Sequence, residues 1–333
     1  MRLSNEAIKM VAFGYLQTKE DERGIHFYRH TDKQTLALYE AEYFYGDWSK
    51  ATTGVLLDFY TDSKNLTFNA VLGDSFEVLI NGLPRYKFSF MEMYETPESC
   101  KYAIKEGENL MGVSVPLENG KRVRVTIVYP ARNAPGVIEY VELDDGAELT
   151  PYTYSGKILF LGDSITQGFY ASHDSLSYAY RVARFFDAEM LNQGVGGTVF
   201  NEAFLDDFDF DPDRVIIGYG TNDFSICSSM NVFKYNLDAY MEKIRLRYGD
   251  KRVYIITPVW KGTIGIQPMG TFEDCRNAIE EMGKSKGFTV IDGFKLVPHS
   301  SEYFSDAVLH PNDLGFGIYA ENLIKEILIA EMK

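Results

Sequence analysis

Four separated residues could together carry out acyl transfer: Ser164, Gly197, Asn222 and His310. A serine hydroxyl attacks a carbonyl carbon when a histidine removes its proton, and the histidine later gives that proton to the departing alcohol. The backbone N–H groups of Ser164 and Gly197, with the side-chain amide of Asn222, would stabilise the oxyanion. These residue types would therefore suit the hydrolysis of a carboxylic ester through an acyl-enzyme.

Each of these residues also fits a structural role. Ser164 follows an apolar run, Ile158–Leu161, and a glycine, so it could simply cap the next turn. Asn222 could be a turn former, and a lone histidine in a loop is more often structural than catalytic. Their shared position favours catalysis, because each follows the carboxyl end of a predicted strand, where open α/β sheets bind ligands.

The second half of the chain alternates predicted strands and helices. We expect buried strands at Lys157–Leu161, Ala188–Asn192, Arg214–Gly218, Arg252–Ile256 and Phe288–Ile291. We expect helices at Ser175–Phe186, Asn231–Tyr248, Thr271–Lys286 and from about Asp313 to Met332. Strands and helices at this spacing form right-handed βαβ units, so about five parallel strands with helices on both faces are predicted.

The first half has a different pattern. A short helix with Ser4 as its cap is expected within residues 1 to about 20. Short runs rich in β-branched and aromatic residues follow, at Leu36–Tyr39, Gly54–Tyr60, Leu66–Val71, Phe76–Ile80, Tyr86–Phe90 and Val123–Tyr129. Turn signals lie between them at Asn81-Gly82, Asn119-Gly120 and Pro135-Gly136. These features predict an antiparallel, jelly-roll-like β-sandwich in residues 1–150, followed by an α/β domain in residues 151–333.

Composition and charge exclude several classes of partner. The net charge of −15 argues against nucleic acid, because a phosphate backbone must be met by clustered lysines and arginines. No signal-peptide core and no apolar stretch of membrane-spanning length occur, so a soluble, cytoplasmic protein without a membrane partner is expected. The three cysteines, Cys100, Cys227 and Cys275, suit reduced thiols, and the histidines lack the spacing of a metal site.

A glycine-rich loop, Gly194–Gly197, follows the second predicted strand. Three glycines in four positions mean that the backbone comes close to something or adopts positive φ. A nucleotide-phosphate loop is one interpretation, but Val199 stands where that fingerprint needs its last glycine. The P-loop-like Gly283-Lys284-Ser285 has Ala278 in place of its first glycine, so neither sequence predicts a nucleotide cofactor.

Four motifs resemble those of the GDSL, or SGNH, hydrolases: Gly162-Asp163-Ser164, the glycine at 197, Asn222 within Gly220–Asp223, and His310-Pro311-Asn312. Their order and spacing agree over about residues 155–333. The resemblance implies a flavodoxin-like three-layer α/β/α fold and a serine esterase that needs no metal or other cofactor. By motif position, Ser164 is similar to the nucleophile, Gly197 and Asn222 to the oxyanion donors, and His310 to the base.

One spacing departs from the family. The orienting aspartate usually lies three residues before the histidine, whereas Asp306 lies four before His310. A bulged loop could still let Asp306 orient the imidazole; otherwise a backbone carbonyl would do so and leave a Ser–His dyad. We expect Asp306 to complete a triad, because a carboxylate gives the developing imidazolium a charged partner.

The order of a β-sandwich and an SGNH domain also resembles bacterial carbohydrate esterases that remove O-acetyl groups from sugars. We therefore expect the substrate to be a small ester, most specifically an acetylated saccharide or glycoside. Trp260 and Asp163 are candidate residues of the substrate pocket, and Trp48 and Trp260 could stack on sugar rings or serve only in packing. The alternatives are a lipase or thioesterase for longer acyl chains, and a carbohydrate-binding protein with a decayed hydrolase site.

Overall fold

The computed structural model describes residues 1–72, 75–89, 101–105, 110–118, 121–131, 135–306 and 308–332. The contacts within the chain divide it into two compact units. The first unit comprises Met1–His30, Lys50–Tyr154 and His173–Ser175, and the second comprises Thr31–Ser49, Ser155–Ser172 and Leu176–Lys333.

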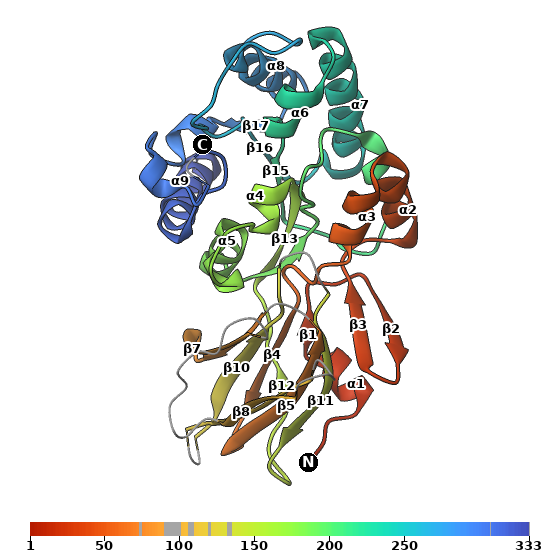
Figure 1. Ribbon diagram of the computed structural model, residues 1–333, viewed down its shortest axis with the longest axis vertical. Helices are drawn as coiled ribbons and strands as arrows, with labels where there is room; N and C mark the ends of the chain where they lie inside the picture. Colours follow the sequence, from red (N-terminus) through yellow and green to blue (C-terminus); the bar gives the residue numbers. More distant parts are fainter. Residues whose placement is uncertain are drawn as a thin grey trace. The chain divides into compact units, whose positions relative to one another are not determined.

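The first unit is built from two antiparallel sheets of six strands each (Figure 1). One has the order β1-β4-β10-β6-β7, with β12 beside β4, and the other has the order β2-β3-β11-β5-β9-β8. The strands of the first sheet are β1 (Ala12–Phe13), β4 (Leu56–Thr61), β6 (Ser75–Ile80), β7 (Leu83–Ser89), β10 (Val123–Val128) and β12 (Thr150–Pro151). Those of the second are β2 (Gln17–Asp21), β3 (Gly24–Tyr28), β5 (Asn65–Leu72), β8 (Lys101–Lys105), β9 (Leu110–Pro116) and β11 (Val137–Leu143).

Both sheets contribute to one apolar core. Phe27 and Phe68 come from the second sheet, Phe59 and Phe76 come from the first, and all four are at most 1% exposed. Alternate side chains of a strand point to opposite faces, so each sheet turns one apolar face to the other. This arrangement confirms the predicted β-sandwich.

The second unit contains a parallel sheet of five strands in the order β14-β13-β15-β16-β17. The strands are β13 (Gly156–Gly162), β14 (Ala188–Asn192), β15 (Arg214–Gly218), β16 (Arg252–Ile256) and β17 (Thr289–Ile291). This order is the flavodoxin-like one, with the first strand flanked by the second and the third. The four apolar residues of β13 are at most 3% exposed, as expected for a strand that is covered on both faces.

Helices cover the two faces of this sheet. On one side α5 (Tyr178–Phe185) packs against α9 (Asp313–Glu331), and α7 (Met230–Tyr248), which packs against α8 (Phe272–Ser285), lies on the other side (Figure 1). The shorter helices are α4 (Ser164–Gln167) and α6 (Thr221–Ile226), with the 3-10 helices η1 (Asp174–Leu176), η2 (Glu202–Phe204), η3 (Gly293–Lys295) and η4 (Ser301–Tyr303), and most of η1 belongs to the first unit. The predicted three-layer α/β/α fold is therefore confirmed.

One predicted strand of the first half is wrong. Leu36–Tyr39 lies in the helix α2 (Asp32–Ala41), which is followed by α3 (Tyr43–Ser49). Thr31 caps α2, and its side chain and that of Gln34 form a reciprocal capping box, so the capping signal outweighs the strand-like run. Both helices belong to the second compact unit, although the predicted domain boundary placed them in the first domain.

Other local predictions meet the structure in part. The N-terminal helix is α1 (Asn5–Met10), capped by Ser4, and β1 and β2 take up most of the remaining length to residue 20. Asn81 and Gly82 both have positive φ and join β6 to β7, as a two-residue hairpin turn requires. Phe90, Cys100 and the Asn119-Gly120 turn lie outside the described residues. In the part of the chain that the structure describes, none of the helices combines the length and apolar character needed to cross a membrane.

Candidate active site

Ser164 begins a short helix at the carboxyl end of β13. Asp163 caps this helix, α4, with its Oδ1 accepting from the N–H of Ile165 at 2.9 Å. The strand must end in glycine here, because a Cβ on Gly162 would lie 2.1 Å from the hydroxyl oxygen of Thr166 and 2.7 Å from the carbonyl oxygen of Gly218. The serine side chain is thus presented by a tightly packed strand-to-helix turn.

His310 contacts both Ser164 and Asp306. Its Nε2 lies 2.9 Å from Ser164 Oγ, and its Nδ1 lies 2.7 Å from Asp306 Oδ2. A carboxylate can only accept, so Nδ1 carries the proton toward Asp306 and leaves Nε2 free to accept from the serine hydroxyl. The three side chains form a continuous chain of hydrogen bonds.

The loop before His310 wraps around the carboxylate of Asp306. Asp306 Oδ1 accepts from the backbone N–H groups of Val308, Leu309 and His310, at 3.2, 2.8 and 3.0 Å. Partial burial raises the pKa of Asp306, but the hydrogen bonds from the His310 ring and from this backbone outweigh it and lower the pKa to about 2. The carboxylate therefore stays ionised, and the extra residue in the family spacing is taken up by this turn.

The glycine-rich loop after β14 is bonded to the serine turn. Val195 N–H donates to the carbonyl oxygen of Gly162 at 2.9 Å, and Gly196 N–H donates to Gln167 Oε1 at 2.8 Å. Gly197 has φ +81°, a backbone conformation that glycine adopts without strain. The loop is fixed on the serine side before it reaches Gly197.

Asn222 holds the same loop from the other side. It lies in α6, and its Nδ2 donates to the carbonyl oxygen of Thr198 at 3.1 Å, which leaves the second amide hydrogen for another acceptor. The neighbouring Asp223 accepts from the N–H groups of Phe200 and Gly220, at 3.0 and 3.1 Å. The structure thus links the predicted oxyanion residues through one hydrogen-bonded framework.

Two side chains of α3 pack on the glycine-rich loop: Trp48, which the sequence offered for stacking or packing, and Tyr45, which sequence reasoning missed. Tyr45 donates its hydroxyl hydrogen to the carbonyl oxygen of Gly197 at 2.7 Å. A Cβ on Gly196 would lie 2.7 Å from the ring of Trp48, and one on Gly197 would lie 2.7 Å from the ring of Tyr45. The dense run of aromatic residues at 43–48 could have indicated a packing surface, but nothing in it identifies the partner as a loop more than 140 residues away.

Aromatic side chains also lie beside the imidazole. The rings of Tyr170 and Phe169 are centred 5.0 and 6.1 Å from that of His310, and Trp48 packs edge-on against Phe169 at 5.3 Å. Tyr170 is 50% exposed and has φ +69°, which is uncommon for a residue with a side chain. An aromatic surface therefore borders the histidine.

The two predicted pocket residues lie in different settings. Asp163 is 3% exposed and borders a small pocket of about 20 Å³, so little of its side chain is available to a substrate at the surface. Trp260 stacks on His299, with ring centres 5.6 Å apart, and packs against Phe304. Phe304 lies just before Asp306, which connects Trp260 to the histidine loop.

Comparison with known families agrees with this geometry. Residues 160–318 match the model described as the GDSL-like Lipase/Acylhydrolase family. This part of the chain is similar to that family, and the match supports an ester-bond hydrolase. Among curated protein sequences, none matches the chain significantly.

Solved structures share the fold along almost the whole chain. A salicylyl-acyltransferase, SsfX3, from a tetracycline biosynthetic pathway has a TM-score of 0.76 at 16% identity, over 96% of this chain and 94% of that one. A Bacteroides ovatus protein designated a GDSL-like lipase has a TM-score of 0.72 at 16% identity, over 99% and 98%. A family two carbohydrate esterase from Clostridium thermocellum, solved with cellohexaose, has a TM-score of 0.60 at 17% identity, over 84% and 93%.

Two buried carboxyls predict how stability depends on pH. Burial raises the pKa of Asp163 and of Asp223 to about 7, above the ordinary value of 3.8. Between pH 3.8 and about pH 7 the unfolded chain has released these two protons, whereas the folded protein still holds them. Their contribution to the free energy of unfolding is therefore complete below about pH 4 and is lost as the pH rises through 7. We expect Asp223→Asn to reduce the loss of unfolding free energy between pH 5 and pH 8, measured by urea denaturation. The exposed Asp250→Asn is the control, and equal slopes for wild type and Asp223→Asn would contradict the assignment.

Proposed function

We propose that this protein is a serine O-acetylesterase that acts on acetylated saccharides or glycosides, with Ser164, His310 and Asp306 as its catalytic triad. The observation that carries the proposal is the continuous hydrogen-bonded chain from Ser164 Oγ through the imidazole to the Asp306 carboxylate. The lowered pKa of Asp306 keeps this carboxylate ionised, as the partner of a histidine base must be.

The reaction would take place in two half-reactions. His310 Nε2 takes the proton from Ser164 as Oγ bonds to the ester carbonyl carbon, and the negative charge on the carbonyl oxygen is met by the N–H groups of Ser164 and Gly197 and the amide of Asn222. The imidazolium gives its proton to the departing sugar hydroxyl and leaves an acetyl group on Ser164. Water, deprotonated by the same imidazole, then attacks the acyl carbon, and the imidazolium returns its proton to Ser164 Oγ as the acyl bond breaks and acetate is released.

The surroundings of the site support a sugar as the alcohol. The surface formed by Phe169, Tyr170 and Trp48 offers ring faces and edges beside His310, and carbohydrates commonly pack against aromatic rings. The fold shared with a carbohydrate esterase that binds cellohexaose is consistent with this substrate class. The acyltransferase with the same fold suggests that such a site also suits other acyl acceptors.

Hydrolysis of p-nitrophenyl esters tests the nucleophile and the acyl group together. Ser164→Ala removes the attacking oxygen, so kcat should fall roughly 10⁴- to 10⁶-fold. In the wild type, acetate should be a better substrate than butyrate or octanoate. Undiminished hydrolysis by Ser164→Ala would refute the serine mechanism, and a maximum at octanoate would favour a lipase or thioesterase. Hydrolysis of a series of acetylated sugars would then identify the alcohol part of the substrate.

Replacement of Asp306 decides between the triad and the dyad. Asp306→Ala removes the acceptor for Nδ1–H, so we expect kcat for p-nitrophenyl acetate to fall about 10³- to 10⁴-fold. Asp250→Ala, at a residue whose side chain is 76% exposed, is the matched control and should keep wild-type kcat. A decrease of less than about tenfold in Asp306→Ala would show that the Ser–His dyad suffices.

Tyr45 is expected to position the oxyanion loop. Tyr45→Phe removes only the hydrogen bond to the Gly197 carbonyl, so kcat should fall roughly five- to tenfold with little change in KM. Tyr43→Phe in the same helix, at a residue that is 73% exposed, should have no effect. Equal kcat values for the two variants would mean that the loop holds its conformation without Tyr45.

A further inference from the structure

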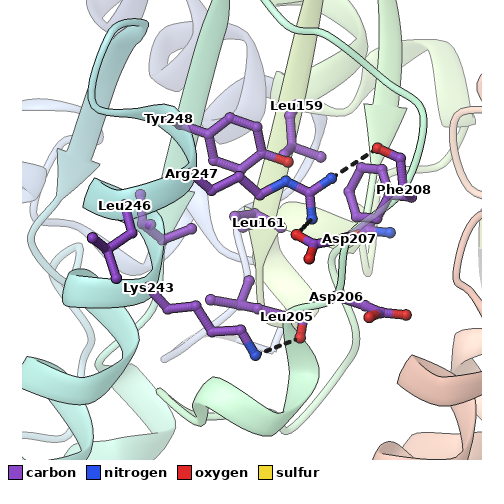
Figure 2. Close-up of a pocket in the computed structure, with 12 residues that line it drawn as sticks. Leu159, Leu161, Leu205, Asp206, Asp207, Phe208, Lys243, Leu246, Arg247 and Tyr248 are labelled. Carbon is purple, nitrogen blue, oxygen red and sulfur yellow. Dashed lines mark hydrogen bonds and ion pairs between the residues drawn. The ribbon is translucent and has the colours of Figure 1, made fainter.

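A pocket of about 300 Å³ lies on the α7 side of the parallel sheet, and its lining residues include none of the proposed triad (Figure 2). The pocket arises from an unusual connection between the strands β14 and β15. Residues 193–213, which join β14 to β15 and are all described, contain only the 3-10 helix η2 and no α-helix. In a doubly wound sheet such a connection normally places a helix over the strands. Here an irregular segment covers them and leaves space beneath it.

The floor and walls of the pocket are apolar. Leu159 and Leu161, two residues apart on β13, point to the same face of the sheet and form the floor. Ile244 from α7 and Leu205 from the irregular segment form walls, and the exposed Leu246 lies at the rim. A concave, mostly apolar space that is open at its rim is typical of a small-molecule site.

Two cations of α7 hold the irregular segment across the pocket. Lys243 Nζ donates to the carbonyl oxygens of Glu202 and Leu205, at 3.0 and 2.8 Å. One turn later, Arg247 donates to the carbonyl oxygen of Phe208 at 2.8 Å and pairs with Asp207 at 3.0 Å (Figure 2). These bonds keep the segment from collapsing onto the leucines.

One polar group of the pocket lining has no hydrogen-bond partner in the described part of the chain. It is the hydroxyl of Tyr248, which is buried, and the residue is 5% exposed. In Figure 2 this hydroxyl points inward, toward Leu159. Buried hydroxyls nearly always have partners, so an unpaired one in a pocket wall indicates a missing acceptor. Burial raises the pKa of Tyr248 to about 12, so the phenol remains a neutral donor.

We propose that this pocket is a second ligand site, which binds a small uncharged molecule with an apolar body and one carbonyl or ether oxygen that accepts from Tyr248. At about 30 Å³ for each water-sized group, the space suits roughly ten non-hydrogen atoms. An uncharged ligand is favoured, because Lys243 and Arg247 are already engaged and Asp206 and Asp207 also line the pocket. The proposal is independent of the esterase function, since the site shares none of the triad residues.

A matched pair of probes tests the acceptor. Acetophenone and isopropylbenzene have the same number of non-hydrogen atoms, but only acetophenone has a carbonyl oxygen. By ligand-observed NMR titration, both should bind the wild-type protein, with acetophenone about fivefold tighter. Tyr248→Phe should abolish that preference, whereas Tyr235→Phe, at a residue of the same helix that is 74% exposed, should keep it.

A second variant tests the location. Leu205→Trp fills the space and should reduce the affinity for both probes at least tenfold. Unchanged binding in Leu205→Trp, no binding to the wild type at millimolar probe, or a preference that survives Tyr248→Phe would each overturn the proposal. Because the Tyr248→Phe change is nearly isosteric, it decides the question even if Leu205→Trp does not fold.

Discussion

The carbonyl oxygen of Gly162 joins the serine turn to the loop that faces it. It accepts from the N–H of Val195 at 2.9 Å and from the hydroxyl of Thr198 at 3.3 Å, and the carbonyl of Thr198 in turn accepts from Asn222. A single path of hydrogen bonds therefore runs from the end of β13 through the glycine-rich loop to α6. Because hydrogen bonds are directional, this path couples the positions of Ser164, Gly197 and Asn222, so the proposed oxyanion donors are arranged by the protein itself.

The parallel domain could be predicted closely because its signals are local. The strands β14, β15 and β16 have the predicted bounds, and Thr271 and Asn312 cap α8 and α9 at or next to the predicted starts. The sandwich was predicted only in outline. Gln17–Asp21 forms β2 with partly or fully exposed residues, so it lacks the alternation that identifies a strand. Leu36–Tyr39 has strand-like residues, yet a capping box just before it starts a helix.

The residues of the proposed site, with Asp306 as the expected partner of the imidazole, were also predicted from the sequence, but spacing alone did not decide how the imidazole is oriented. Spacing alone left Asp306 and a backbone carbonyl as alternatives, because it does not specify the path of the chain between Asp306 and His310. The folded loop favours Asp306, since Oδ1 accepts from three N–H groups and so fixes Oδ2 toward the imidazole. A carboxylate held by the backbone of its own loop tolerates an inserted residue better than one that depends on an exact spacing.

The contribution of α3 could not have been predicted, because it depends on a contact between segments 152 residues apart, from Tyr45 to Gly197. The glycines at 194, 196 and 197 indicated a close approach to something. The loop comes close to side chains of the protein itself, since Trp48 and Tyr45 occupy the space that side chains at 196 and 197 would fill. A loop with so few side chains has little of its own to hold it in place. The absence of Cβ atoms thus permits the positive φ of Gly197 and also admits the aromatic rings that stabilise that conformation from outside.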